Sequence, residues 1–517
     1  MGKILPSFRK AIIDDIVGSV TSNNTTYYAF GANPIAYVGA VPNVANDDYS
    51  TYFTNNWKMI FGKKLTNINF EPVIAKNIWS TNTVYSRYDN TSNTLYLNND
   101  YYVISSPTIV GGSYYVYKCI DNNQNAVSTI DPGSIGTPTQ VTTFETSDGY
   151  KWRYVASVSS ANFDKFATDD YIPVYPDPSV VSTANLYAGV EVVVISNPGS
   201  GYNTYANGVV KSNPNSTIIQ ISDSSSPSSD FYNKNGVYIK NISAATSQLR
   251  NVEDYVANSS GRWIYLDEPA NTTNIIPDLT EYIISPRIFF ETDGDSQPKA
   301  YSTVNPIGNS IASVIILDAG SNISWANVSV ISNPSFGSGA NLYAIVPPPG
   351  GHGIDPATEL NTKGLAINFS FSNTESNTIL TSNVNYNKIG IIKAPYSLTA
   401  NNTKGSVYVA NTFDQTLFAN VSPSFTFNVG ETVKGVNSGA VGIVAFSNST
   451  TVRLVGDMSF IDGEYISNTN GNQVTTLAIN SLGDIYTKDL KPIYVENINN
   501  VNRIDNQTET FKLVIQI

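Results

Sequence analysis

The stretch from Asp148 to Val158 constrains the fold more than any other part of the chain. It opens with an Asp-Gly pair, which is typical of a tight turn, and then alternates at period two. One face of the predicted strand carries Tyr150, Trp152, Tyr154, Ala156 and Val158, and the other carries Lys151, Arg153 and Ser157. Three aromatic side chains on one face bury a large apolar area. The strand is therefore either an ordinary core strand or one wall of an assembly interface.

The remainder of the chain has the composition of many short strands joined by tight turns. Its 517 residues include 35 Gly and 26 Pro, and Asn, Ser, Thr, Tyr, Val and Ile are abundant. With 41% hydrophobic residues, 33 Tyr and 21 Phe, the chain has enough apolar surface to bury a core. Its length predicts about two to four domains. We therefore expect a mainly β, β-sandwich-like, multi-domain fold with a few short helices.

The charge balance and the single cysteine narrow the class of protein. A net charge of −12 is poorly suited to neutralising phosphates, so no nucleic-acid partner is expected. No run approaches the ~20 apolar residues of a membrane helix, and the first residues lack the features of a signal peptide. We expect a chain that folds in the cytoplasm, without membrane insertion. Cys119, the only cysteine, then fits a small buried hydrophobe and leaves no disulfide or Cys-based metal site.

Two helices are predicted near the N-terminus. The first lies within residues 1–20, with Ser7 as its N-cap and Gly18 as its stop. The second spans about 47–62, where Asp47 and Asp48 supply the cap and Gly62 follows. Strands are predicted at Asn67–Ile74, Tyr101–Ser105, Tyr114–Ile120 and Thr510–Ile517.

Two internal repeats follow residue 180. Gly199 and Gly320 end similar segments that stand 121 residues apart, and Ser-Asn-Pro recurs at Ser212 and Ser332. This spacing predicts a duplicated β unit over about 181–346. In the second repeat, Phe427-Asn428-Val429-Gly430-Glu431 recurs as Phe460-Ile461-Asp462-Gly463-Glu464, 33 residues later, which predicts two hairpin modules at about 400–485.

Few residues of the sequence are candidates for a catalytic or metal-binding site. His352, the only histidine, lies in a Gly- and Pro-rich loop, where packing or a turn hydrogen bond is a better interpretation than a catalytic triad. The acidic loop from Asp293 fails the EF-hand pattern, because its sixth and twelfth positions are Pro298 and Val304. The acid pairs Glu145/Asp148 and Asp169/Asp170 fit turn-capping better than a glycosidase pair. We therefore expect no enzyme, and predict no catalytic, cofactor-binding or metal-binding residue.

A series of blocks along the chain carries a family resemblance. The blocks are Phe30-Gly31 with Pro34, the Trp57 helix followed by Trp79, Val116–Asp121, Asp148–Tyr154, Tyr171–Val174, Ile389–Pro395 and Asn497–Ile517. In this order they resemble the gene-eight-type baseplate wedge subunit of T4-like contractile-tailed bacteriophages. The resemblance covers about half of the chain, whereas residues 181–384 and 398–485 depart from the shorter members of that family.

The resemblance implies a domain plan. Residues 1–180 would join 385–397 and 486–517 in one discontinuous core domain, with the C-terminal strand as a candidate neighbour of the Tyr150 strand. Residues 181–384 would form a repeat-containing β domain, and 398–485 a small inserted β module with two Phe-x-x-Gly-Glu hairpins.

The resemblance also implies a function. The protein would be a late, non-enzymatic structural component of the virion tail baseplate, assembled in the host cytoplasm and taking part in the rearrangement that triggers sheath contraction. Its partners would be a second copy in a homodimer, other wedge proteins, and fibre or sheath-proximal tail proteins. The candidate interface or core residues are Trp57, Trp79, Tyr150, Trp152, Tyr154 and Tyr171.

Two rival functions remain open. One is a fibre-attachment or host-recognition protein that binds a receptor or glycan. The other is a carbohydrate-active β protein, which would need two acids about 5–9 Å apart in a groove.

Overall fold

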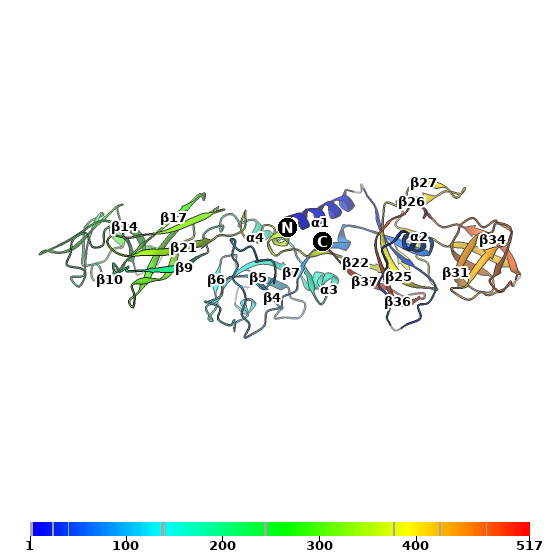
Figure 1. Cartoon of the computed structure of the whole chain (residues 1–517), viewed down its shortest axis with the longest axis horizontal. Helices are drawn as coiled ribbons and strands as arrows, with labels where there is room; N and C mark the ends of the chain where they lie inside the picture. The colour runs from blue at the N-terminus through cyan, green and yellow to red at the C-terminus, as the bar shows by residue number, and fades with distance from the viewer. Residues whose placement is uncertain are drawn as a thin grey trace. The chain divides into compact units, whose positions relative to one another are not determined.

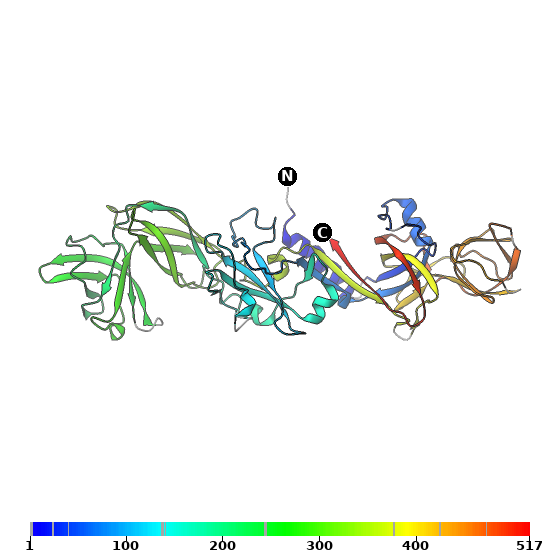
Figure 2. The same cartoon turned by 90° about the horizontal axis from the view of Figure 1, so that it is seen from below.

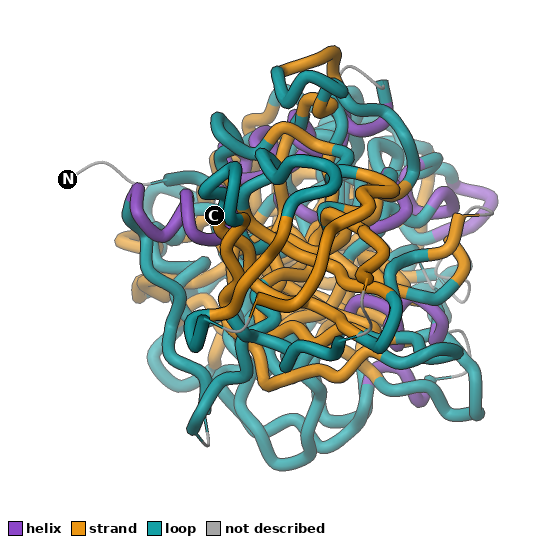
Figure 3. The backbone as a smooth tube through the Cα atoms, turned by 90° about the vertical axis from the view of Figure 1, so that its right-hand side faces the viewer, coloured by secondary structure: helices purple, strands orange, loops and turns teal. Residues whose placement is uncertain are grey.

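The protein, seen in a computed structural model, is mainly β. The structure describes all residues except 1–3, 23–24, 40, 136–138, 140, 242–245, 376–377, 423–424 and 472. Strands prevail over helices (Figures 1 and 3), and the chain forms two compact units, Met1–Pro72 with Lys363–Ile517 and Val73–Thr362. This confirms the predicted multi-domain β fold in which both chain ends share one discontinuous domain. Among helices in the described ranges, none is long and apolar enough to cross a membrane.

A five-stranded antiparallel sheet forms the centre of the first unit. Its strands, in order, are β28 (Thr412–Asp414), β2 (Met59–Leu65), β1 (Tyr27–Ala32), β25 (Val384–Lys393) and β36 (Pro492–Arg503). Every residue of β1 is buried, because Tyr27 and Ala29 enter one apolar core while Tyr28 and Phe30 enter another. The sheet packs so closely that a Cβ atom on Gly62 would lie 2.2 Å from the Phe413 ring.

Smaller pairings complete the sheets of this unit. Strand β22 (Gly364–Phe371) pairs with the C-terminal strand β37 (Glu509–Gln516), with Leu365 opposite Ile515. The remaining strands are β23 (Thr374–Glu375), β24 (Thr378–Ile379), β26 (Tyr396–Leu398), β27 (Lys404–Val407) and β35 (Ile485–Tyr486). The predicted terminal strand is therefore confirmed.

A closed six-stranded barrel, drawn in orange in Figures 1 and 2, contains the second sequence repeat. In order its strands are β29 (Leu417–Ser422), β32 (Thr451–Gly456), β31 (Val441–Ser447), β30 (Thr432–Gly435), β33 (Tyr465–Asn468) and β34 (Gln473–Ser481). Val433 pairs with Asn468 and Gly435 pairs with Ile466, so exchanging the two repeats maps this pairing onto itself. The Gly430 amide donates to Val444 at 2.8 Å, and Gly463 donates to Leu477 at 2.7 Å. The repeat thus builds two halves of one pseudo-two-fold barrel.

The two predicted helices exist with different limits. Helix α1 spans Pro6–Thr21 and begins after Leu5, so Ser7 and Gly18 lie inside it rather than at its ends. Pro6 at the first helical position explains this start, since its ring already has a helical φ. Helix α2 spans Tyr49–Trp57, and Asp48 caps it by accepting the Thr51 amide at 2.8 Å, as predicted. The helix ends before residue 62 because the chain continues into β2.

A four-stranded sheet begins the second unit. Its order is β4 (Tyr102–Ser105), β5 (Tyr114–Asp121), β7 (Lys151–Val158) and β6 (Phe144–Glu145). The second unit also contains β8 (Tyr171–Pro173), η2 (Pro132–Ser134), α3 (Ser160–Phe166) and α4 (Pro178–Val181). The segment η1 (Asn67–Asn69) belongs to the first unit, and β3 (Phe70–Ala75) runs from the first unit into the second. The strands predicted at residues 101–105 and 114–120 are confirmed, whereas residues 67–69 form a 3-10 turn before β3. Residues 73–180, expected with the chain ends, belong to this second unit.

Strand β7 corrects the prediction of one apolar and one polar face. A bulge opposite Val116 and Tyr117 interrupts the alternation, because Ala156 and Tyr154 pair with these consecutive residues. Tyr150, Trp152 and Tyr154 therefore enter one core while Ala156 and Val158 enter another. Arg153, expected on the polar side, is buried. The partners of β7 are β5 and β6, so the proposal that the C-terminal strand adjoins it is wrong.

The rest of the second unit consists of two further sheets and a strand pair. The seven-stranded sheet runs β10 (Ala206–Val209), β16 (Glu281–Ser285), β13 (Gly236–Lys240), β14 (Gln248–Asn258), β15 (Gly261–Leu266), β12 (Ile218–Ile221) and β11 (Ser212–Asn215). The four-stranded sheet runs β19 (Ser310–Asp318), β18 (Lys299–Asn305), β17 (Arg287–Thr292) and β20 (Ala326–Ile331). Strand β21 (Ser338–Ile345) pairs with β9 (Val192–Ser200), while η4 (Thr272–Asn274) and α5 (Pro356–Glu359) complete the unit.

The first repeat is a local turn motif rather than a duplicated β unit. Gly199 has a φ of +63°, and its amide donates a hydrogen bond to Asn197 Oδ1 at 3.0 Å. Gly320 has a φ of +74°, and its amide donates to Asp318 Oδ1 at 3.0 Å. The second marker differs, because Ser212 begins strand β11 whereas Ser332 lies after β20. The sheets of the two segments also differ in strand number and order.

Candidate functional site: a buried ionic cluster beside a cleft

The single histidine lies at the centre of a buried charged cluster in the second unit. Its loop contains three glycines with positive φ, +85° at Gly350, +94° at Gly351 and +76° at Gly353. A Cβ atom on Gly351 would lie 2.2 Å from the Ala184 carbonyl oxygen, so only glycine fits there. After this loop Asp355 caps α5 by accepting the Thr358 amide at 3.2 Å. The loop and the short helix together place His352 and Glu359 in the core.

Glu359 joins the members of the cluster. Its Oε1 accepts hydrogen bonds from Lys118 Nζ at 2.8 Å and from His352 Nδ1, and its Oε2 accepts the Gly353 amide at 2.7 Å. Lys118 and His352 have no exposed side-chain surface, and the Glu359 side chain is 2% exposed. The Lys118 ammonium also lies 3.3 Å from the centroid of the Tyr88 ring. The carboxylate of Glu359 thus faces two buried cation-forming groups.

The second imidazole nitrogen contacts another carboxylate. His352 Nε2 lies 2.9 Å from Glu191 Oε2, at an angle too poor for a hydrogen bond, so the contact is electrostatic. The Nδ1 atom also lies 3.3 Å from Lys118 Nζ. The imidazole therefore stands between two carboxylates and an ammonium group.

The surroundings shift the ionisation of the two glutamates. Burial by itself would raise the pKa of Glu359, but the charges and hydrogen bonds of Lys118 and His352 hold it well below its usual range. Burial by itself would also raise the pKa of Glu191. The attraction of His352, Arg153 and Lys118 outweighs this effect, so the pKa of Glu191 is lowered. Burial lowers the pKa of Lys118, against the attraction of Glu359. Both carboxylates are therefore ionised at neutral pH.

Arg153 adds a further positive charge, which Glu191 and Glu359 attract without a hydrogen bond. It stands opposite Lys118 on the neighbouring strand, where like charges disfavour each other. Arg153 is 3% exposed, and its Nε finds no hydrogen-bond partner among the described residues. Burial lowers the pKa of Arg153, although a guanidinium keeps its charge in proteins. The two carboxylate oxygens of Glu191 likewise have no hydrogen-bond partner among the described residues, and Glu191 supplies the main attraction for Arg153.

A cleft of about 1270 Å³ opens beside this cluster. Arg153 and Glu191 line it, and so does Tyr187, whose ring centroid lies 5.8 Å from the guanidinium of Arg153. Strands β9 and β19 supply its apolar wall, which includes Val194 and Val314. The cleft therefore connects the buried charges with an apolar channel.

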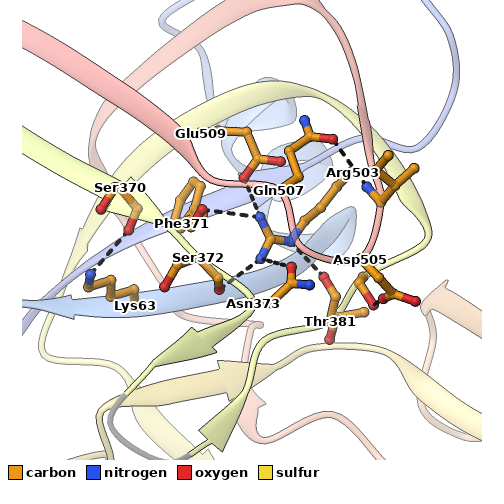
Figure 4. Close-up of polar contacts among 12 residues, drawn as sticks. Lys63, Ser370, Phe371, Ser372, Asn373, Thr381, Arg503, Asp505, Gln507 and Glu509 are labelled. Carbon is orange, nitrogen blue, oxygen red and sulfur yellow. Dashed lines mark hydrogen bonds and ion pairs between the residues drawn. The ribbon is translucent and has the colours of Figure 1, made fainter.

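The first unit contains a second buried arginine, Arg503, at the end of β36 (Figure 4). Its guanidinium donates to the carbonyl oxygens of Thr381 at 3.0 Å, Phe371 at 3.3 Å and Ser372 at 2.8 Å. It also donates to Asn373 Oδ1 at 3.4 Å and forms an ion pair with Glu509. Burial raises the pKa of Glu509, while the charge of Arg503 opposes the rise. Arg503 thus fastens the β36–β37 connection to the segment after β22.

The aromatic residues proposed from the sequence lie in two places. Tyr150, Trp152 and Tyr154 are fully buried in one core of the second unit, where the Tyr150 and Trp152 rings stack at 5.4 Å between centroids. Trp79 packs against that core and donates Nε1–H to Ser128 at 3.1 Å. The structure therefore brings these four together.

Trp57 and Tyr171 are placed elsewhere. Trp57 is half-buried in the first unit, where a Cβ atom on Gly456 of the barrel would lie 2.9 Å from its ring. Tyr171 is half-buried at the start of β8. Neither joins the four aromatic residues described above.

The acidic groups considered for catalysis or metal binding make local contacts. Asp148 accepts the amides of Thr129 at 2.7 Å and Ile130 at 3.0 Å, which fits its interpretation as a turn-capping acid. Asp293 accepts the Ser324 amide at 2.9 Å. Within the described residues, no group of three or more His, Cys, Asp or Glu side chains is arranged to hold a metal ion.

Sequence reasoning singled out His352 but missed its partners. Lys118, Glu191 and Glu359 come from three distant segments, so no spacing in the sequence links them. Alternation places Arg153 on the face opposite the aromatic residues and does not predict its burial. The one available signal was a lone histidine among glycines, which marks a packed loop without identifying what it packs against.

The sequence has no match among models of known protein families, and none among curated proteins.

Proposed function

We propose that the protein is a structural subunit of the baseplate wedge of a contractile-tailed bacteriophage. The observation that carries the proposal is the ordered series of family-like blocks at both ends of the chain, taken together with the folding of Met1–Pro72 and Lys363–Ile517 into one unit. The resemblance implies a domain that joins both chain ends, although it also placed residues 73–180 in that domain, and these belong to the second unit. The proposal includes self-association as a homodimer, contacts with other wedge proteins, and a location in the tail baseplate.

The physical character of the chain supports a scaffold. In the first unit, hydrogen bonds from the buried Arg503 guanidinium tie a segment after β22 to the C-terminal hairpin, within which Arg503 pairs with Glu509. Its barrel is built from two related halves and packs on Trp57. Such mutually fastened β modules suit a protein whose role is to hold neighbours in position. Stable assembly would require interfaces of about 2,000 Å² or more.

The location of the protein in the virus particle tests this proposal. A small tag fused to the protein and viewed by electron microscopy should appear at the tail baseplate in a six-fold arrangement. A label on the capsid would contradict the proposal. A label at distal fibres would instead favour the alternative, a fibre-attachment or host-recognition protein.

Solution behaviour provides an independent measurement. The purified chain should sediment as a dimer and should form a larger complex when mixed with the neighbouring wedge proteins. A chain that stays monomeric alone and in that mixture would contradict the proposed assembly role.

A further inference from the structure

A small pocket lies in the first unit, where helix α2, the barrel and strand β35 come together. Its volume is about 200 Å³, and its lining includes Phe53, Asn56 and Trp57 from α2, Gly456–Ser459 from the barrel, and Ile485–Lys488 from β35 and the residues after it. Pockets that hold drug-sized ligands measure about 300–1,000 Å³. This pocket therefore has room for a single small ring rather than for an extended chain.

Aromatic side chains form part of the wall of this pocket. Trp57 and Tyr486 are half-buried, and Phe53 is 58% exposed, so the protein does not cover these rings completely. Gly456 fixes the position of the Trp57 ring, because a Cβ atom at this glycine would lie 2.9 Å from it. Aromatic rings of this kind offer flat apolar faces to the C–H groups of a ligand.

The polar groups of the pocket are rich in hydrogen-bond acceptors. Asn56 is 4% exposed, and its Nδ2 donates to the Leu490 carbonyl oxygen at 2.6 Å, which fixes the side-chain amide. The Oδ1 atom of Asn56 receives no hydrogen bond from the described residues. Asp457 accepts the Ser459 amide at 2.9 Å through Oδ1, and its second oxygen can accept another donor. Asp457 and Lys488 are the acid and the base of the lining, so their charges balance.

We propose that this pocket binds one sugar ring, whose hydroxyl groups donate to Asn56 Oδ1 and to the Asp457 carboxylate and whose C–H face packs on Trp57. A sugar supplies both the donors that these oxygens need and an apolar face for the aromatic wall. An anion would meet acceptor oxygens, and an organic cation would gain nothing from a lining whose charges balance. The ring belongs either to a free monosaccharide or to the end of a glycan chain. This inference does not depend on the protein being a baseplate subunit.

Calorimetric titration of the full chain tests the pocket with defined probes. The probes are glucose, galactose, mannose and N-acetylglucosamine, a disaccharide that ends in each of them, choline and acetate. A sugar that binds about equally as monosaccharide and as disaccharide supports the proposal with a free sugar as ligand. Binding that is at least about 10-fold tighter for the disaccharide supports it with a glycan end. Tighter binding of choline or acetate than of every sugar, or no sugar binding up to about 100 mM, overturns it.

Two pairs of matched variants locate the binding site. Asp457→Asn should weaken sugar binding about 10-fold, because a charged acceptor is lost, whereas Asp462→Asn should change it less than about 2-fold. Asp462 is the matched control, since it is an exposed acid of the barrel that accepts the Ile479 amide and lies outside the lining. Phe53→Ala should weaken binding about 3-fold or more, and Tyr49→Ala, at an 82% exposed ring of the same helix outside the lining, less than about 2-fold. Equal effects of target and control in both pairs would place the sugar elsewhere and overturn the proposal.

Thermal unfolding separates a binding role of Asp457 from a structural one. Without sugar, Asp457→Asn and Asp462→Asn should melt within about 2 °C of each other, because asparagine retains the oxygen that accepts the neighbouring amide. With the bound sugar present in excess, the wild type and Asp462→Asn should melt higher, whereas Asp457→Asn should respond much less. A sugar-induced rise of equal size in both variants would overturn the proposal.

Discussion

Each unit of the protein buries one arginine, and the two differ in how their hydrogen bonds are satisfied. Arg503 donates to three backbone carbonyl oxygens and to one side-chain amide oxygen, and it forms an ion pair with Glu509. Its hydrogen-bond donors and its charge therefore all have partners. Arg153 is equally buried but has no partner for its Nε among the described residues, and stands opposite another cation. The comparison teaches that burial alone does not reveal the role of an arginine. The guanidinium of Arg503 fastens segments together through hydrogen bonds, whereas that of Arg153 is held by the charges of Glu191 and Glu359.

The largest expected effect follows from removing the satisfied arginine. Arg503→Met leaves three buried carbonyl oxygens and the Glu509 carboxylate without their donors. We expect a loss of about 4 kcal/mol in the free energy of unfolding of the first unit. Denaturant unfolding measures this loss, and amide hydrogen exchange of peptides from each unit assigns it to the first.

A control for this prediction lies two residues away. Asp505 is exposed and accepts the Ser382 hydroxyl, so Asp505→Asn should cost less than about 1 kcal/mol. A similar loss in both variants would mean that the whole turn, rather than the guanidinium, stabilises the connection.

A smaller loss is expected from removing the anion that the second cluster shares. Glu359→Gln keeps the shape and one acceptor but leaves Lys118 and His352 with a single carboxylate, Glu191. The expected cost is about 3 kcal/mol in the unfolding of the second unit. Glu145→Gln, at an exposed acid of the same unit, serves as the matched control and should change the free energy by less than about 0.5 kcal/mol. An unchanged stability in Glu359→Gln would refute the ion cluster.

The pH dependence of stability should differ in sign between the two sites. The pKa of Glu359 is lowered in the folded state, so its contribution is present above the unfolded pKa of about 4.3 and is lost as the pH falls toward the folded value. The pKa of Glu509 is raised, so Glu509 stays protonated to a higher pH in the folded state than in the unfolded state. Its contribution to stability is therefore lost as the pH rises above about 4.3. Acid should therefore weaken the second unit through Glu359, whereas Glu509 should weaken the first unit as the pH rises.

Calorimetric unfolding across this pH range checks both signs. Glu359→Gln should flatten the acid-side loss of the second unit, and Glu509→Gln should remove the opposite slope of the first. Parallel pH profiles in wild type and in both variants would show that other carboxylates dominate.

Local features of the fold were predictable wherever local chemistry determines them. Alternation located β4 and β5, Asp48 located the start of α2, and the Phe-x-x-Gly-Glu recurrence located the two halves of the barrel. The prediction for β7 failed on its faces, because one bulged residue transfers Ala156 and Val158 to another core. Alternation cannot report a bulge, since the sequence on both sides of it still alternates.

The sites were much less predictable than the strands. Lys118, Glu191 and Glu359 meet only after β5, the segment before β9 and α5 have been packed together. The same holds for Arg503, whose acceptors are mostly backbone carbonyl oxygens and therefore have no residue-type signature. A sequence motif records side chains at fixed spacing, and neither cluster has one.

The barrel has a consequence for the origin and engineering of the chain. Its first and last strands, β29 and β34, are hydrogen-bonded neighbours, with Phe418 opposite Ser481. The entry and exit of the barrel therefore lie side by side, but Ile443, Ala445 and Val455 on its strands are buried in the core that also contains Tyr27 and Ala29. Its two-fold internal pairing fits a duplicated half-barrel. Removing the barrel would expose apolar surface of the first unit, so the module cannot be exchanged without repacking that core.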